Sequence, residues 1–319
     1  MFLLLLYSSV SSVCIKEEIE QGRSYDVVNV DLMISNCFFR RILANSNDGN
    51  IIMISNSNLL KITDSMFYNC RTSASYGGAI HASCVFIEMN KICVNECASS
   101  YAGMFLYASI QQNITIEATT VTKSRSDGNG YHPIMFGCLY STFNQNNFSN
   151  NYCYHGSSIC STSNTGFSSG FCTLSNDRSS HSIVLYLVSD SVTSKFEKLN
   201  LLNNTQNTQS YGIIYSSGFS TFNNCFFSFN RDNILFYCAA RSISVTDCFI
   251  SHSSSFLKSG SVSITIIYQT PEYAFNHAHF KSYYCFAEYE LTVKMVKSMP
   301  KQSCSIILLQ LLIITFMCI

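Results

Sequence analysis

Residues 62–70 read Ile-Thr-Asp-Ser-Met-Phe-Tyr-Asn-Cys, and residues 222–230 read Phe-Asn-Asn-Cys-Phe-Phe-Ser-Phe-Asn. Each stretch places a first apolar residue five positions before a second one, with a turn-forming residue between them. The pattern occurs nine times, and its second apolar residues, here called the core anchors, are Phe39, Phe67, Ile92, Val121, Phe148, Cys172, Leu201, Phe227 and Ile250. Successive anchors lie 23 to 29 residues apart. Such a period predicts a solenoid of stacked repeats; chance matching in a chain that is 47% hydrophobic is the alternative.

A second apolar cluster usually follows each anchor after about 13 residues, as in Gly77-Gly78-Ala79-Ile80 and in residues 102–105, 133–136, 182–185, 211–214 and 233–236. No part of a unit sustains the 3.6-residue period of a helix over several turns. The abundant Ile, Val, Phe, Tyr, Thr and Asn favour strands and turns. Strands this short cannot bury a face alone, so stacking of the units must supply the core.

The five-residue spacing is odd, so both apolar residues of a unit face inward only if the chain bends between them. Asn36, Asp64, Asn224 and Asp247 occupy the expected bend, and Asn and Asp tolerate the left-handed conformation of tight corners. We therefore predict an all-β fold, a right-handed parallel β-helix solenoid of about nine to ten coils. Cys225 and Cys248 share one repeat position in consecutive coils, which predicts a ladder of buried thiols or a disulfide bond.

The repeats also carry a resemblance to a known family. The stretch Phe67-Tyr68-Asn69-Cys70 with Gly77-Gly78-Ala79-Ile80, and later residues 148–151 and 227–230, resemble the FxxN and GGAI repeats of the polymorphic outer-membrane proteins. GGAI occurs once in full, and the resemblance spans about residues 30–260. It implies a pectin-lyase-like β-helix and a role in surface adhesion or interaction. The family's bacterial members carry a C-terminal barrel, which we do not expect in these 319 residues.

The two ends of the chain predict secretion and membrane attachment. Residues 1–13 are an apolar run followed by small residues, typical of a signal peptide. We expect the β-helix at 25–290, a polar linker at 291–305 and an apolar anchor at 306–319. Fourteen residues of helix span only about 21 Å, so a lipid-anchor signal, a marginal membrane tail and a truncated span stay open. The 16 cysteines suit an oxidising compartment, and Asn113, Asn147 and Asn203 are glycosylation candidates.

Charge and composition argue against several kinds of chemistry. The net charge is zero, so nothing favours nucleic acid as a partner. No motif indicates a cofactor or a metal site, and Cys93 and Cys97 form an isolated CxxxC. His277 and His279 would share one face of a strand, but only Cys285 suggests a third metal ligand. We interpret both histidines as surface residues near the end of the solenoid.

An enzyme of this fold would need clustered carboxylates. Asp177 and Asp232, two coils apart beside Arg178 and Arg231, are the best catalytic candidates. We interpret them instead as exposed turn aspartates paired with arginines. The hypothesis is a non-catalytic surface or secreted protein that binds protein or glycan ligands and is membrane-attached through its tail. A polysaccharide lyase or glycoside hydrolase is the alternative.

Overall fold

The computed structural model describes residues 12–15, 18–20, 25–44, 51–73, 76–126, 130–162, 166–182, 184–188, 192–207, 211–231, 234–251, 258–264, 267–268, 274–277, 279–280, 282 and 285. These residues form a parallel β-solenoid, with one sheet of 25 strands and a second of seven. Helix is absent from this part of the chain, so it contains no helix that could cross a membrane. The all-β, parallel β-helix prediction is confirmed.

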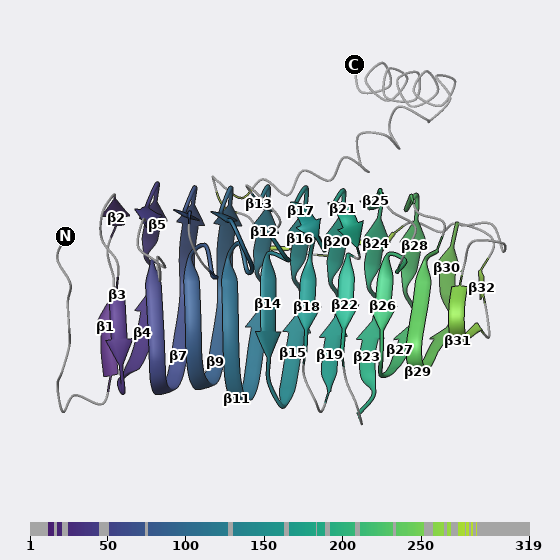
Figure 1. Cartoon of the computed structure of the whole chain (residues 1–319), viewed down its shortest axis with the longest axis horizontal. Helices are drawn as coiled ribbons and strands as arrows, with labels where there is room; N and C mark the ends of the chain where they lie inside the picture. The colour runs from purple at the N-terminus through teal and green to yellow at the C-terminus, as the bar shows by residue number, and fades with distance from the viewer. Residues whose placement is uncertain are drawn as a thin grey trace, which may run out of the picture. The chain divides into compact units, whose positions relative to one another are not determined.

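Successive coils stack their strands in four rows, named a to d in the order in which one coil passes through them (Figure 1). Row a contains β3 (Tyr25–Val28), β7 (Ile52–Tyr68), β9 (Ile80–Asn95), β11 (Leu106–Glu117), β14 (Ile134–Gly137), β18 (Ile159–Ser161), β22 (Leu185–Leu187), β26 (Ile214–Ser216), β29 (Phe236–Thr246) and β31 (Lys258–Ile264). Of these, β7 and β9 continue through rows b and c, and β11, β29 and β31 continue through row b.

The other strands each belong to one row. Row b adds β1 (Ser12–Ile15), β4 (Asp31–Ser35), β15 (Tyr140–Asn144), β19 (Phe167–Gly170), β23 (Ser194–Glu197) and β27 (Phe219–Asn223). Row c adds β2 (Glu18–Glu20), β5 (Phe38–Arg40), β12 (Thr120–Thr122), β16 (Asn147–Ser149), β20 (Thr173–Ser175), β24 (Asn200–Leu202), β28 (Phe226–Ser228), β30 (Cys248–Ile250) and β32 (Ile267–Tyr268). Row d is the smaller sheet: β6 (Leu43–Ala44), β8 (Arg71–Thr72), β10 (Ala98–Ser99), β13 (Arg125–Ser126), β17 (Tyr152–His155), β21 (Arg178–Ser182) and β25 (Thr205–Gln206).

The solenoid has about seven turns, rather than the predicted nine to ten. Seven is also the number of strands in row d, so these turns possess all four rows. The repeat pattern used for the prediction covers only rows b and c. Those two rows extend beyond row d at both ends of the described solenoid, which explains the higher estimate.

The core anchors stack in file along row c, with a correction in two units. Strand register places Val94 between Phe67 and Val121, and Leu174 between Phe148 and Leu201. Ile92 and Cys172 lie two residues earlier, directly after the left-handed corner residues Lys91 and Phe171. A shift of two residues keeps side chains on the same face of a strand, so both versions of the pattern look apolar. The corrected anchors, at 39, 67, 94, 121, 148, 174, 201, 227 and 250, are spaced 23 to 28 residues apart.

The predicted corners between rows b and c are present. Asn36, Asp64, Asn224 and Asp247 have φ between 47° and 54°, in the left-handed region. The other coils bend at the same place with Lys91, Ala118, Gln145, Phe171 and Lys198. A second left-handed corner follows row c, for example at Asn69, Asn150 and Asn203. These corners turn the chain sharply enough for rows b, c and d to enclose one interior.

The interior is filled by aliphatic side chains and a column of aromatic rings. Phe143, Phe167, Phe196 and Phe222 have ring centroids 5.1, 5.1 and 4.5 Å apart in sequence order. Dense stacking of this kind buries each ring against the coils above and below it. The GGAI stretch closes onto this core: Gly77 has a φ of 70°, and a Cβ on Gly78 would lie only 2.1 Å from the carbonyl oxygen of Met104.

The chain divides into residues 1–286 and 287–319. The second unit lies outside the described residues, and so do residues 1–11. The predicted linker and apolar tail, and most of the predicted signal peptide, therefore stay predictions.

Candidate functional site: an aromatic face and a polar groove

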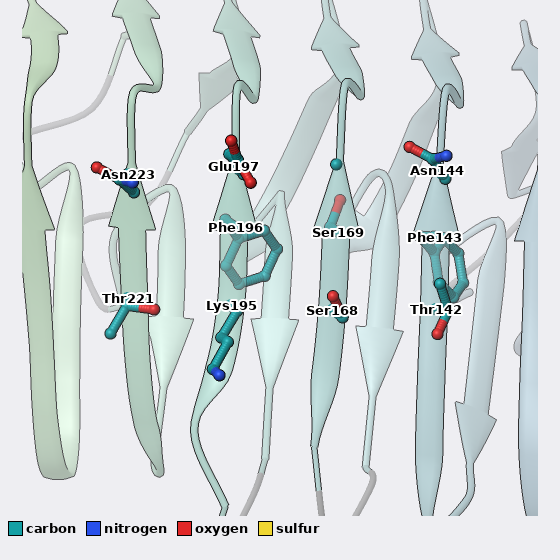
Figure 2. Close-up of a pocket in the computed structure, with 11 residues that line it drawn as sticks. Thr142, Phe143, Asn144, Ser168, Ser169, Lys195, Phe196, Glu197, Thr221 and Asn223 are labelled. Carbon is teal, nitrogen blue, oxygen red and sulfur yellow. The ribbon is translucent and has the colours of Figure 1, made fainter.

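A shallow groove of about 390 Å³ crosses the outer side of row b (Figure 2). Its outward lining comes from β15, β19, β23 and β27, and consists of Thr142, Asn144, Ser168, Gly170, Lys195, Glu197, Thr221 and Asn223. The surface dips over β19 because that strand presents only Ser168 and Gly170 to solvent. The longer Lys195 and Glu197 stand on the next strand.

The groove presents hydroxyl, amide, ammonium and carboxylate groups in two rows. Lys195 and Glu197 are two residues apart on β23, and Figure 2 shows their side chains extending in opposite directions along the strand. Their charges balance, so the groove attracts neither strongly acidic nor strongly basic ligands. Its chemistry suits a neutral polar molecule held by hydrogen bonds.

The outward side of row a is aromatic. Tyr186, Tyr215 and Tyr237 are consecutive in the strand register. Their rings stack nearly parallel, with centroids 4.7 and 5.7 Å apart, and Tyr211 packs edge-on against the second and third rings. Burial, followed by the neighbouring Tyr215, raises the pKa of Tyr186 to about 12. This hydroxyl therefore stays protonated at physiological pH.

A second aromatic cluster lies nearer the N-terminus, around Tyr107 of row a. Tyr76 contacts Tyr101 and Tyr107, with ring centroids 4.6 and 4.4 Å apart. Further along, Tyr131 stacks on His155 at 4.6 Å. A hydrogen bond with Tyr101 raises the pKa of Tyr76. We call this cluster and the Tyr186–Tyr237 stack together the aromatic face.

The aromatic face has no formal charge along its central row. That row reads His81, Tyr107, Met135, Cys160, Tyr186, Tyr215 and Tyr237 in register. Exposed serines, Ser83 and Ser109, occupy the next outward position in two of its coils. The face therefore combines flat rings with hydroxyl groups, and most of its rings are half-buried and rigidly packed.

Asp177 is inside the solenoid, not on an exposed turn. Its carboxylate accepts hydrogen bonds from the backbone N–H of Asn151, at 2.8 Å, and from the hydroxyl of Ser158. Burial raises its pKa to about 7, although these hydrogen bonds oppose the rise. Asp232 lies outside the described residues. Strand register pairs Arg178 with Thr205 and Thr205 with Arg231, so Asp177 is equivalent to Asn204 and Asn230 and not to Asp232.

Cys225 and Cys248 are neighbours, as their shared repeat position predicts. Both are buried free thiols, and the backbone N–H of Cys225 donates to the sulfur of Cys248 at 3.2 Å. The disulfide in the structure joins Cys93 to Cys285 instead, with Cα atoms 5.7 Å apart and a sequence separation of 192. The sequence gives no spacing signal for this pair. It also removes Cys285 as a metal ligand, and no group of three candidate ligands occurs within the described ranges.

The strap is our name for the segment 274–285, and its described residues (274–277, 279–280, 282 and 285) run across the outward side of row c. The amide of Asn200 forms two hydrogen bonds with the backbone of Phe275, and the hydroxyl of Thr120 donates to the carbonyl of Phe280 at 2.7 Å. His277 and His279 are buried under these contacts rather than on the surface, with 7% and 6% of their area exposed. Burial lowers the pKa of His277.

The three glycosylation candidates differ in accessibility. Asn113 is exposed on row b, and Asn203 is half-buried at a left-handed corner. Asn147 is 2% exposed, on the outward row of residues that the strap crosses. Sequence patterns alone give the three sites equal weight.

Sequence reasoning missed one buried histidine. His132 is 4% exposed, and burial lowers its pKa to about 3, so the ring is neutral. A Cβ on Gly156 would lie 1.9 Å from this ring, so glycine is required beside it.

The chain matches no protein-family model, no curated protein and no solved structure among those compared with it. Any proposal for its function therefore rests on the geometry described above.

Proposed function

We propose that this chain is a non-catalytic binding protein of the secretory pathway, acting outside the cell or at its surface, and that the aromatic face is its binding surface. The ligand that suits this face best is a neutral, extended glycan. Coils repeat about every 4.8 Å, so a ligand lying along the Tyr186–Tyr237 stack meets one packed ring in each of three consecutive coils. Tyrosine supplies contact area at low cost in conformational entropy.

The absence of formal charge on the central row of the aromatic face supports a neutral ligand rather than an acidic one. An acidic polymer needs arginine or lysine at its binding groups. Rings can stack against the apolar faces of sugars, and the exposed Ser83 and Ser109 can pair with sugar hydroxyls. The groove on row b offers similar hydroxyl and amide groups for a branch of the same ligand.

The enzyme alternative is weakened by the position of Asp177. A glycosidase needs two carboxyl groups facing one substrate. Asp177 has no exposed area and points into the solenoid interior, so it is not available for that task.

The proposed location rests on sequence features together with the Cys93–Cys285 pair. Disulfides persist in oxidising compartments and are rare in the cytosol. An ordered pair joining residues 192 positions apart agrees with passage through the secretory pathway.

We also propose kinship with the pectin-lyase-like β-helices and the polymorphic outer-membrane protein repeats. Two features support it. The glycines of the GGAI stretch have a structural reason, since Gly77 is left-handed and Gly78 leaves no room for a side chain. The last position of the FxxN units is a buried ladder residue in Asn151 and Asn230.

The test is a glycan array probed with the purified protein, followed by titration calorimetry on the best neutral oligosaccharide. Tyr186→Ala and Tyr215→Ala should each weaken binding at least tenfold, about 1.4 kcal/mol, because central tyrosines contribute strongly to binding energy. Phe229→Ala is the control, since Phe229 is an aromatic residue with 67% of its area exposed and lies at a corner outside rows a and b. Unchanged binding in both row a variants, or turnover of a polysaccharide, would overturn the proposal.

A further inference from the structure

The strap contacts row c in the way that a bound peptide contacts a receptor. The Nδ2 group of Asn200 donates to the carbonyl of Phe275 at 2.8 Å, and the N–H of Phe275 donates to Oδ1 of Asn200 at 3.1 Å. This pair of bonds reads the peptide backbone and not the side chain at that position. The bond from Thr120 to the carbonyl of Phe280 does the same.

The two histidines of the strap bond with two corner carbonyls and with the hydroxyl of Thr173. Nε2 of His277 lies 2.8 Å from the carbonyl oxygen of Lys198, a left-handed corner residue. His279 lies within 2.9 Å of the hydroxyl of Thr173 and 3.3 Å from the carbonyl of Gln145, another corner residue. Corner carbonyls outside the strand ladder are free to accept hydrogen bonds from a ligand.

The outward ladder beneath the strap is polar and fully covered. Thr120, Asn147, Thr173 and Asn200 are 0 to 2% exposed, although they point away from the solenoid interior. Their hydroxyl and amide groups would face solvent if the strap were displaced. Polar groups of this kind persist on a buried surface when a partner satisfies them.

We propose that this outward part of row c, from Thr120 to Asn200, is a binding face for an extended peptide, and that the strap is its internal occupant. The external partner is an extended polypeptide segment. It presents a free backbone N–H and C=O to Asn200, and hydrogen-bonding side chains two residues apart to the corner carbonyls of Lys198 and Gln145. This face is distinct from the aromatic face, so the inference does not depend on the proposed glycan ligand.

Occupancy by the strap makes the face self-inhibited. The strap is part of the same chain and is joined to Cys93, so it competes at a high effective concentration. An external peptide gains access only when the strap is lifted.

The test uses the full chain with a disabled strap, carrying Cys93→Ser, Phe275→Pro, His277→Ala, His279→Ala and Cys285→Ser, where proline removes the N–H that bonds with Asn200. The probe is a fluorescein-labelled synthetic peptide of residues 274–285 with serine at the last position, and the readout is fluorescence anisotropy. We expect saturable binding to the disabled chain that is at least tenfold tighter than binding to the native chain. Circular dichroism and thermal unfolding check that both chains are folded.

Three controls make the test specific. Asn200→Ala in the disabled chain should weaken binding at least tenfold, whereas Thr115→Ala, at an exposed position on row b outside the groove, should leave it unchanged. A probe with proline in place of Phe275 should also bind at least tenfold more weakly, because proline has no N–H to donate to Oδ1 of Asn200. Absence of binding to a folded disabled chain, or equal binding after Asn200→Ala, would overturn the proposal.

If the disabled chain does not fold, hydrogen–deuterium exchange of single variants of the native chain tests the proposal instead. Asn200→Ala alone should increase hydrogen–deuterium exchange at Phe275 at least tenfold, and Thr115→Ala should not. Unchanged exchange in the Asn200 variant would show that this residue does not hold the strap, and the peptide-binding face would be rejected.

Discussion

Asp177 interrupts a ladder of asparagines inside the solenoid. Asn204 donates from its amide to the carbonyl of Leu174 and accepts from the N–H of Asp177, and Asn230 acts in the same way one coil later. Such residues satisfy the backbone groups that each corner leaves unpaired. Asp177 accepts equally well, but its ionised carboxylate has no N–H to donate.

The raised pKa of Asp177 predicts a stability that depends on pH. Between the unperturbed value of 3.8 and about 7, the folded chain holds a proton that the unfolded chain releases. The free energy of unfolding therefore falls as pH rises through this window, by about 4 kcal/mol in total. Below pH 4 the effect disappears.

Asp177→Asn should remove this pH dependence and raise the free energy of unfolding at pH 8 by up to about 4 kcal/mol, with little change at pH 4. Urea denaturation at the two pH values measures both effects. Asn204→Asp is the converse control and should destabilise the chain at pH 8 more than at pH 4. Equal pH dependence in native and Asp177→Asn chains would contradict the assignment.

Exposure at the residue level also decides which asparagines take a glycan. On expression through a eukaryotic secretory pathway, we expect Asn113 to carry a glycan, because it is exposed, and folded protein to lack one at Asn147, because that side chain is buried. Peptide mass spectrometry after enzymatic deglycosylation measures occupancy. Asn113→Gln should remove a glycan-sized mass shift, and Asn147→Gln should not. Full occupancy of Asn147 in folded protein would contradict the structure.

Single residues were only partly predictable from sequence. The corners at Asn36, Asp64, Asn224 and Asp247 follow from residue type, because Asn and Asp tolerate left-handed backbone. Phe171 and Ala118 adopt the same conformation although their types disfavour it. Coil geometry imposes it there, as tertiary context often overrides local preference.

At the scale of elements, the strap depends on both its hydrogen bonds and its disulfide. Hydrogen bonds contribute about 1 kcal/mol each, whereas ordering a residue costs about 1 to 2 kcal/mol in backbone entropy. The bonds from Asn200, Thr120 and the two histidines therefore do not secure the strap by a wide margin. The Cys93–Cys285 bond supplies much of the remainder.

Cys285→Ser should lower the free energy of unfolding by about 2 to 4 kcal/mol and make the strap accessible to protease near Lys281. Thermal denaturation and limited trypsin digestion measure the two effects. Cys84→Ser is the comparison variant, since Cys84 is a buried free thiol on β9, and it should leave the strap protected. A strap that resists trypsin equally in both variants would show that hydrogen bonds alone hold it.

Sequence patterns could not predict this element. Residues 274–285 carry no repeat, and the face that they cover reads as ordinary outward-facing Thr and Asn. Rows b and c could be predicted from the sequence, because each repeat unit has two apolar positions, one on either side of the corner between these rows. Row d was missed because its strands, such as Arg71–Thr72, are too short to show an alternation.

At the scale of the whole molecule, each coil is stabilised mainly by its two neighbours. Phe222 shows this in the aromatic column: its ring lies 4.5 Å from Phe196 and 5.6 Å from Phe236, centroid to centroid. Loss of one ring leaves a cavity between coils that cannot easily collapse, because both are held by parallel hydrogen-bond ladders.

Phe222→Ala should lower the free energy of unfolding by about 3 to 5 kcal/mol. Phe219→Ala, on the same strand but 39% exposed, should change it by less than about 1 kcal/mol. Urea denaturation followed by tyrosine fluorescence and circular dichroism compares the two. Similar losses in both variants would mean that the aromatic column is not a stabilising core.

The period of the anchors was sufficient to predict the architecture, because a two-residue error in a unit leaves the inward face apolar. It was not sufficient to predict the aromatic face. Tyr186, Tyr215 and Tyr237 are 22 to 29 residues apart, so their alignment becomes visible only when the register of row a is known. The number of residues in each connecting turn varies, and sequence alone does not fix that register.

The Cys93–Cys285 bond also changes how the molecule would carry mechanical force. A pull on the chain beyond Cys285 passes through the sulfur bridge to Cys93 in β9. The coils between these two cysteines are thereby excluded from the loaded path and cannot be peeled off one by one from the C-terminal side. If the tail tethers this protein to a surface, a pull at the N-terminal end would load only the coils before Cys93 and leave the Tyr186–Tyr237 stack relaxed.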